Sequence, residues 1–312
     1  MKNKYSFILI AFFIFIIEAS KAEEIEYPLN IQMNAFQLKV ENIFKLKAPN
    51  DEILMKTASV QINDIDNEKK YRVFFQNGFI FEKKKLIQKS LPNTLYFEQN
   101  GGVKSVFTID KNDFAIVSNK KEDCIFFSII NLTSSKILLD SECLPDNKGI
   151  DLNGVGGAVI ILDENIYLSV GAPENQSEKI RNLAQLKSSI FGKIIKISKK
   201  NLLNSKEYDL KYSIFSYGHR NPQGMVEVNN NIFSTEHGPM GGDEINLIQP
   251  NKNYGWPLKS YGVRYIFFKG DTGKSFKYNK KIDNYKGPIY SFVPSVAVSS
   301  LSECPKNLKN YY

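Results

Sequence analysis

Histidine is scarce in this sequence of 312 residues, which contains only His219 and His237. Zinc sites draw on several histidine and cysteine ligands at short, recurrent spacings. The two histidines match no such spacing, and no cysteine lies near them. We therefore expect them to be hydrogen-bonding residues of polar loops rather than a zinc pair.

Extended runs of positive charge are also absent. Lysine and arginine, 41 residues together, outnumber the 33 acidic residues but are interspersed with them, and the longest basic run is 83–85. A chain with scattered charges presents no basic stripe to a phosphate backbone. We therefore expect no nucleic-acid partner.

Only one long apolar run occurs, at residues 6–17, and it is short of the about 20 residues that a membrane span needs. Two lysines precede the run, and Ser20-Lys21-Ala22 follows with small residues suited to cleavage. We expect residues 1–22 to be a signal peptide, with an uncleaved anchor as the alternative. The mature domain would then span 23–312, lack a stable membrane span, and be periplasmic or secreted.

Cysteine is sparse, with copies at Cys124, Cys143 and Cys304. Export permits a disulfide. Cys124 and Cys143 flank a strand–turn–strand pattern that can bring them together, and the sequence leaves a bridge between them open. Cys304 is the odd thiol.

Helical periodicity is absent apart from residues 178–189, where we expect one short helix or an ordered loop. Three stretches, 106–118, 158–170 and 225–236, instead share an apolar run, an Asp- or Asn-rich turn and a second apolar run. This pattern is typical of β-hairpins. Its recurrence predicts an all-β fold, a β-propeller of four-stranded blades, rather than a pair of β-sandwiches with more evenly spaced strands.

The blade pattern is incomplete. A weaker hairpin copy lies at 71–83, and a further unit is expected to begin at 289–301, shortly before the sequence stops. Since a propeller closes on its first blade, we expect either fewer blades or a truncated reading frame with its last blades incomplete, and we favour truncation.

Polar side chains gather in two loops, YGHRNPQGM at 217–225 and TEHGPMGGDE at 235–244. Loops between the strands of a propeller lie at a mouth of its central channel, where ligands bind. Arg220 carries a planar fork of donors suited to a carboxylate or a quinone oxygen. Asn221 and Gln223 add neutral donors and acceptors.

The second loop contains a candidate cation site. Gly238 permits a backbone turn that directs its own carbonyl and that of Pro239 at a hard cation. Calcium accepts backbone oxygens readily, together with carboxylates and water. A glycine-rich tight turn with solvated acids is the alternative.

The ordered string GHRNPQGM…TEHGPMGGDEINLI…NYGWP resembles the signature of soluble sugar dehydrogenases that depend on pyrroloquinoline quinone (PQQ), the glucose/sorbosone dehydrogenase family. Residues 156–173 and 184–197 are similar to two further stretches of the family. The resemblance covers residues from about 150 to 300. It implies an exported, six-bladed propeller with PQQ lying over the channel mouth.

The resemblance also implies site residues. Calcium is held in part by the backbone carbonyls of Gly238 and Pro239. The side chains that face the cofactor are Arg220 and Asn221 at the quinone end, Gln223 close by, His237 and Asp243. In such enzymes calcium polarises the quinone carbonyl, a base removes the proton of the anomeric hydroxyl, and hydride passes to the quinone.

The chain departs from the family at this general base, which is a histidine where the sequence has Asn153 or Gly154. Ala172 likewise stands where the family has an acid. Asp151 is the nearest residue that can replace the base, although a carboxylate of ordinary pKa is a weak base. Arg220 and Asp151 are therefore the candidate catalytic residues.

These observations predict an exported, PQQ- and calcium-dependent oxidoreductase that oxidises the anomeric hydroxyl of an aldose or a related alcohol. A periplasmic or membrane electron acceptor would be its partner, and the resemblance allows a homodimer. The missing base supports an alternative, a non-catalytic propeller of the same lineage that binds a carbohydrate or a protein.

Overall fold

The computed structural model of the protein describes residues 29–32, 37–40, 57–65, 68–83, 85–97, 101–145, 150, 152–173, 178–263 and 284–303. The chain divides into two units, residues 1–47 with 307–312, and residues 48–306. The described part of the first unit is an antiparallel hairpin of β1 (Leu29–Gln32) and β2 (Gln37–Val40). The predicted signal peptide and Cys304 lie outside the described residues.

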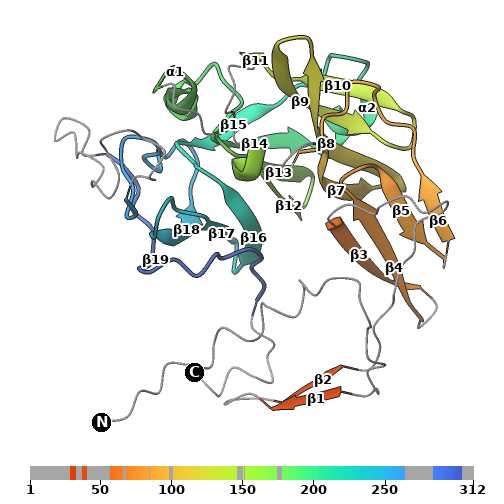
Figure 1. Ribbon diagram of the computed structural model, residues 1–312, viewed down its shortest axis with the longest axis horizontal. Helices are drawn as coiled ribbons and strands as arrows, with labels where there is room; N and C mark the ends of the chain where they lie inside the picture. Colours follow the sequence, from red (N-terminus) through yellow and green to blue (C-terminus); the bar gives the residue numbers. More distant parts are fainter. Residues whose placement is uncertain are drawn as a thin grey trace, which may run out of the picture. The chain divides into compact units, whose positions relative to one another are not determined.

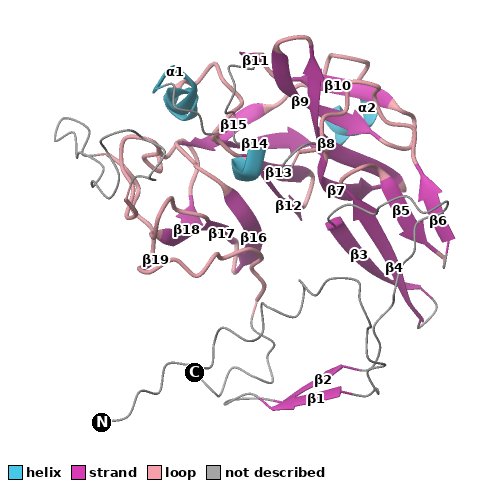
Figure 2. Ribbon diagram, in the orientation of Figure 1, coloured by secondary structure: helices cyan, strands magenta, loops and turns pink. Residues whose placement is uncertain are grey.

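The described part of the second unit contains four antiparallel sheets, in which consecutive strands pair (Figures 1 and 2). The first sheet has β3 (Thr57–Ile65), β4 (Glu68–Phe75), β5 (Phe79–Glu82) and β6 (Lys85–Gln88). The second has β7 (Val103–Ile109), β8 (Asn112–Lys121), β9 (Cys124–Asn131) and β10 (Lys136–Asp140), with β11 (Leu144–Pro145) also paired to β9. The third has β12 (Gly156–Leu162), β13 (Asn165–Val170), β14 (Lys193–Ser198) and β15 (Ser213–Tyr217). The fourth has β16 (Pro222–Val228), β17 (Asn231–Glu236), β18 (Asp243–Ile248) and β19 (Tyr290–Phe292).

The four sheets are blades of a β-propeller. Their first strands pack in a row, β3 against β7, β7 against β12 and β12 against β16. Figure 1 shows the blades in chain order, from orange through green to blue. The predicted all-β propeller is thus confirmed, and the described residues form four blades.

The three predicted hairpins are present as β7–β8, β12–β13 and β16–β17, and the weaker copy forms β4–β5. Two-residue turns with both residues at positive φ match the right-handed twist of the strands. Asp110 and Lys111 adopt φ of 46° and 66°, and Asn229 and Asn230 adopt 52° and 64°. Asp and Asn tolerate this region, which explains their place between the apolar runs.

The core lies between neighbouring blades. The largest buried cluster joins the second and third blades, and two smaller clusters join the first with the second and the third with the fourth. Strands buried on both faces have continuous rather than alternating apolar runs. Residues 114–117 of β8 are such a run, with every side chain almost completely buried.

The expectation that residues 289–301 open a fifth unit is wrong. Tyr290 pairs with Ile245 and Phe292 with Asp243, so β19 is the fourth strand of the fourth blade. A long connection separates β18 from β19, whereas the other blades place their strands closer in sequence. That connection made the last strand of one blade resemble the first strand of the next.

The disulfide left open by the sequence is present between Cys124 and Cys143, with Cα atoms 5.4 Å apart. β11 pairs with the start of β9 and brings the two residues together.

Helical structure in the described residues is limited to short segments: η3 (Leu152–Gly154), α1 (Glu178–Arg181), η4 (Asn182–Gln185) and α2 (Lys199–Asn204). The short helix expected within 178–189 is therefore confirmed as α1. In the part of the chain that the structure describes, no helix has the length and apolar character to cross a membrane.

An ion pair links the first two blades. Arg72 of β4 binds both carboxylate oxygens of Asp113 of β8, with Nη1 2.9 Å from Oδ1, and Thr108 donates to the same oxygen at 2.8 Å. Burial opposes ionisation of Asp113, but the hydrogen bonds from Arg72 and Thr108 and the guanidinium charge lower the pKa of this carboxyl below its ordinary value.

Replacing Arg72 with methionine is expected to lower the free energy of unfolding by about 2 kcal/mol, because it leaves a buried carboxylate without its cation. Adding Asp113→Asn should recover part of the loss.

The folded pKa of Asp113 lies below the unfolded value of about 4. Its stabilising contribution is therefore present above pH 4 and lost as the pH falls through the folded value. Urea unfolding at pH 7 and pH 3 should show a smaller acid effect in Asp113→Asn, and equal acid effects would contradict this assignment.

Candidate functional site

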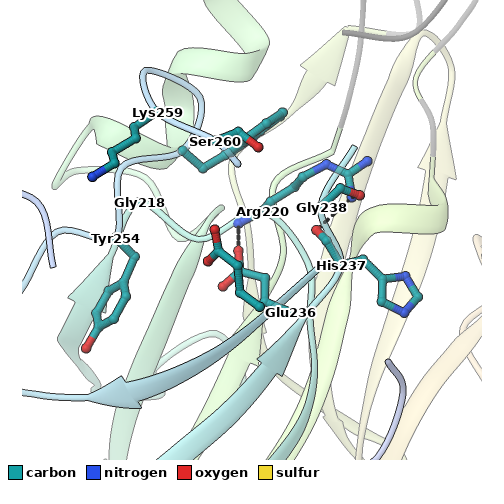
Figure 3. A pocket seen from close by; sticks show the side chains of 10 residues that line it. Gly218, Arg220, Glu236, His237, Gly238, Tyr254, Lys259 and Ser260 are labelled. Carbon is teal, nitrogen blue, oxygen red and sulfur yellow. Dashed lines mark hydrogen bonds between the residues drawn. The ribbon is translucent and has the colours of Figure 1, made fainter. Parts of the chain in front are cut away.

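The two signature loops meet in a pocket at the fourth blade (Figure 3). Its lining comes from the loop before β16, the end of β17, the loop between β17 and β18, the start of β18 and the loop after β18. The residues that line it are Gly218, Arg220, Glu236, His237, Gly238, Glu244, Tyr254, Trp256, Lys259 and Ser260.

Glu236, the last residue of β17, is a buried carboxylate that holds the loop before β16. Its Oε1 accepts hydrogen bonds from the backbone N–H groups of Arg220 and Asn221, the second at 3.3 Å. Its Oε2 lies 3.0 Å from Nδ1 of His219. One carboxylate thus binds three consecutive residues, the backbone of Arg220 and Asn221 and the ring of His219.

His219 is completely buried and supports this loop from behind. Its two ring nitrogens lie within hydrogen-bond distance of Glu236 Oε2, 3.0 Å from Nδ1, and of Ser216 Oγ, 2.8 Å from Nε2. The ring also stacks on Tyr254, with centroids 4.5 Å apart. His219 is therefore a hydrogen-bonding residue, as the sequence predicts.

Arg220 connects the two loops. Its Nη1 donates to the carbonyl oxygens of His237 at 2.9 Å and Gly238 at 2.7 Å. The guanidinium also lies over the ring of Trp256, 5.3 Å from the centroid. Figure 3 shows the side chain extending through the pocket towards Gly238. The structure thus brings together the predicted donor fork and one of the predicted cation-binding carbonyls.

Asn221 contacts the third blade, and Gln223 contacts Asn221. Asn221 Oδ1 accepts from the Gly156 N–H at 3.0 Å and from Gln223 Nε2 at 2.5 Å. A Cβ atom placed on Gly154 would lie 4.0 Å from Cβ of Asn221. The segment where the family carries its base therefore lies beside the signature loop, while Asp151 itself is outside the described residues.

Asp243 shapes the second loop. Its Oδ1 accepts from the Gly238 N–H at 3.0 Å, and its Oδ2 accepts from the side chain of Ser295 and from the N–H groups of Val296 and Ala297. Burial opposes ionisation, but these bonds lower the pKa of Asp243 below its ordinary value. The observed role is structural, and contact with a cofactor stays a prediction.

His237 lines the pocket, and its side chain is directed away from Tyr254 (Figure 3). Its Nε2 is buried and has no hydrogen-bond partner within the described residues. An unsatisfied ring nitrogen at this position is compatible with a polar ligand. The predicted cofactor-facing role of His237 stays a prediction.

Seven lining residues were given no role at the sequence level, among them Glu236, Glu244, Trp256 and Lys259. Glu236, Glu244 and Trp256 fall inside the quoted signature, so the sequence could have indicated them, whereas nothing in the sequence distinguishes Lys259 from the other lysines. Glu244 lies opposite Glu236 across β17 and β18. Burial, and the charge of Glu236, raise the pKa of Glu244 to about 8.

The charge balance of the pocket favours an anionic ligand. Burial and the nearby Glu236 raise the pKa of Glu244, which weakens the negative charge that this side chain brings to the pocket. Arg220 and Lys259 are the two basic residues of the lining, and Glu236 and Glu244 are the two acidic ones. A planar carboxylate-bearing ligand matches the guanidinium fork and the flat face of Trp256.

The calcium site implied by the resemblance fits the backbone in part. A Cβ atom on Gly238 would meet the carbonyl oxygens of Gly241 and Gly242 at 2.3 and 2.4 Å, so only glycine allows this crowded turn of carbonyls. No group of three or more His, Cys, Asp or Glu side chains in the described residues is placed to hold a metal. Calcium prefers six to eight oxygens. The loop therefore suits an ion that shares its ligands with an anionic partner and water.

Comparisons with known proteins agree on one family. The family model described as Glucose / Sorbosone dehydrogenase matches residues 128–308. The aldose sugar dehydrogenase YliI of Escherichia coli strain K12 is 34% identical over 153 residues, which are 47% of this chain and 39% of that protein. Quinoprotein glucose dehydrogenase B of Acinetobacter calcoaceticus is 29% identical over 145 residues, 39% of this chain and 30% of that protein. The chain thus matches less than half the length of these relatives.

A solved structure is similar in fold. The apo-form of the soluble aldose sugar dehydrogenase from Escherichia coli superimposes with a TM-score of 0.56 at 21% identity, covering 80% of this chain and 76% of that one. At this identity the similarity concerns the fold alone, and it supports the propeller architecture.

Proposed function

Because the chain belongs to the glucose/sorbosone dehydrogenase family, we propose that it serves in the oxidation of an aldose or a related alcohol, with PQQ and calcium as cofactors. The names of two relatives, an aldose sugar dehydrogenase and a quinoprotein glucose dehydrogenase, support the reaction and the quinone. These activities belong to proteins that the chain matches over part of their length, and they come to it as a proposal.

One observation carries the proposal. The Arg220 guanidinium and the Gly238 carbonyl oxygen lie within 2.7 Å of each other in one pocket. The first is a group for binding anionic oxygen, and the second is a group for binding a cation. A quinone with carboxylates, bound together with calcium, requires both at a single place.

The chain's own residues would divide the work. Arg220 orients the quinone end through its donor fork, Trp256 provides a flat apolar face, and Lys259 adds a basic group to the lining. Gly238 and Pro239 would hold calcium through their carbonyls. When bound, PQQ supplies the hydride acceptor and calcium polarises its carbonyl as a Lewis acid.

Proton removal is assigned to the segment beside Asn221. Asp151 is the proposed base, since it is the carboxylate nearest in sequence to Gly154. An ordinary carboxylate is a weak base, so we expect turnover below that of enzymes with a histidine there. We further propose that the protein is exported to the periplasm or beyond, and that its propeller has six blades. The apolar run at 6–17 supports export.

Reconstitution tests the proposed function. We expect PQQ with calcium chloride, but neither alone, to quench the fluorescence of Trp256, the only tryptophan of the chain, and to support dye reduction with at least one aldose. Calcium alone should bind weakly, because the protein supplies only part of its ligands. PQQ binding without turnover over a panel of aldoses and alcohols would support the non-catalytic alternative. The absence of PQQ binding at any calcium concentration would overturn the proposal.

A further inference from the structure

Lys193, the first residue of β14, is a completely buried lysine that does not line the pocket. Its ammonium group donates three hydrogen bonds, to the carbonyl oxygens of Leu183 and Ala184 at 3.0 Å each and of Phe191 at 2.6 Å. Three donors thus meet three acceptors. Burial nevertheless lowers the pKa of Lys193 to about 7, and the Glu142 carboxylate acts in the opposite direction.

The carbonyls bound by Lys193 belong to the segments that support the signature loop. The Ala184 oxygen also accepts the N–H of Gly218 at 3.0 Å. The Gly192 oxygen, one peptide before Lys193, accepts the N–H of His219 at 3.1 Å. The Ala184 carbonyl oxygen thus binds both the Lys193 ammonium and the N–H of Gly218, which lies two residues before Arg220.

The same turn supports Trp256. Gln185, the last residue of η4, donates from Nε2 to the Trp256 carbonyl at 2.5 Å and exchanges hydrogen bonds with the side chain of Asn253. The side chain of Ala184 packs in one buried cluster with Trp256. A shift of η4 would thus move both the loop of Arg220 and the ring beneath its guanidinium.

A buried charge is a poor device for stability alone, since an apolar side chain of similar volume often stabilises a fold as well or better. Lys193 instead fixes one arrangement of carbonyls at the ends of η4 and of the turn before β14. We infer that Lys193 is a positioning residue of the pocket, which holds η4 in the position that sets Arg220 and Trp256 for an anionic ligand. The ligand in this inference rests on the proposed function, whereas the positioning of Trp256 does not.

The test uses Lys193→Met, the conservative Lys193→Arg, and Lys196→Met as a matched control. Lys196 lies on the same strand and contacts Tyr167 at 5.9 Å, outside the pocket. Because the chain has one tryptophan, acrylamide quenching reports on the pocket alone. In the folded protein we expect Lys193→Met to raise the quenching constant about twofold or more. We also expect it to weaken PQQ binding in calcium about tenfold, as for other residues that orient a ligand-binding group.

Lys193→Arg keeps the donors and should restore most of both properties, and Lys196→Met should match the wild type. If Lys193→Met only lowers the melting temperature, with Trp256 quenching and PQQ affinity unchanged, the positioning role is refuted. If Lys193→Met fails to fold, Lys193→Gln replaces it in the same assays, and wild-type quenching and PQQ affinity in Lys193→Gln refute the positioning role equally. If the wild type itself binds no PQQ, the proposed function fails. The acrylamide quenching of Trp256 then still tests the positioning role of Lys193.

Discussion

Glu236→Ala is expected to lower the free energy of unfolding by about 4 kcal/mol, the largest effect of any single substitution in the pocket. The carboxylate accepts hydrogen bonds from the backbone of Arg220 and Asn221 and from the His219 ring, all of them buried. Each donor left without an acceptor costs about 1–3 kcal/mol. Urea unfolding at pH 7, followed by Trp256 fluorescence and by circular dichroism, measures the loss.

Glu236→Gln separates charge from shape in this prediction. The amide keeps one oxygen for the backbone donors of Arg220 and Asn221 but presents an NH₂ group towards the His219 ring. We therefore expect about half the loss of Glu236→Ala. Glu164→Ala is the matched control. The Glu164 carboxylate is largely exposed, and its ion pair with Lys199, at 3.7 Å, is expected to contribute little to stability. A Glu236→Ala protein as stable as this control would show that the loop is held by other contacts.

Arg220→Met is expected to weaken PQQ binding by over a hundredfold, or about 3 kcal/mol, while unfolding changes far less. Methionine retains much of the volume of the side chain but removes every donor that faces the Gly238 carbonyl and the ring of Trp256. Arg220→Lys should remain well below the wild type, because an ammonium lacks the planar fork. Titration of PQQ in calcium, followed by Trp256 quenching, gives the affinities.

The control for this experiment removes a positive charge elsewhere. Lys211 is exposed and pairs with Asp209, so Lys211→Met changes net charge without touching the pocket. We expect its PQQ affinity to equal that of the wild type. Equal PQQ affinities for Arg220→Met and Lys211→Met would show that Arg220 does not bind PQQ specifically. Any remaining affinity would then reflect a general attraction between the basic chain and an anion.

Local chemistry made much of the fold predictable. The hairpins follow from apolar runs separated by residues that adopt positive φ, such as Asn229 and Asn230, and both signals lie within a few residues of each other. The same reasoning failed at β19, which joins β18 across a long connection. Pairing between distant segments depends on which edge is free in the folded sheet, and neighbouring residues do not encode that.

The candidate site divides in the same way. Arg220, Asn221 and Gly238 are recognisable from their donor geometry, their spacing and their resemblance to a family signature. The buried partners of these residues cannot be recognised from the sequence. Glu236, for example, contacts His219 only because folding brings the end of β17 against the loop before β16. Trp256 lies in the signature, but its place under the guanidinium required the folded loop.

The sequence by itself determined an all-β propeller, a disulfide-compatible pair of cysteines and two loops suited to an anion and a cation, since each of these depends on residue type and short-range order. Tertiary structure alone decided that Asp243 is enclosed by backbone donors, that the pKa of Glu244 is raised beside Glu236, and that the buried Lys193 binds three carbonyl oxygens. The physical reason is common to the three. Burial and the neighbours brought by distant strands set the protonation and the partners of a polar group, and neither is a property of the residue alone.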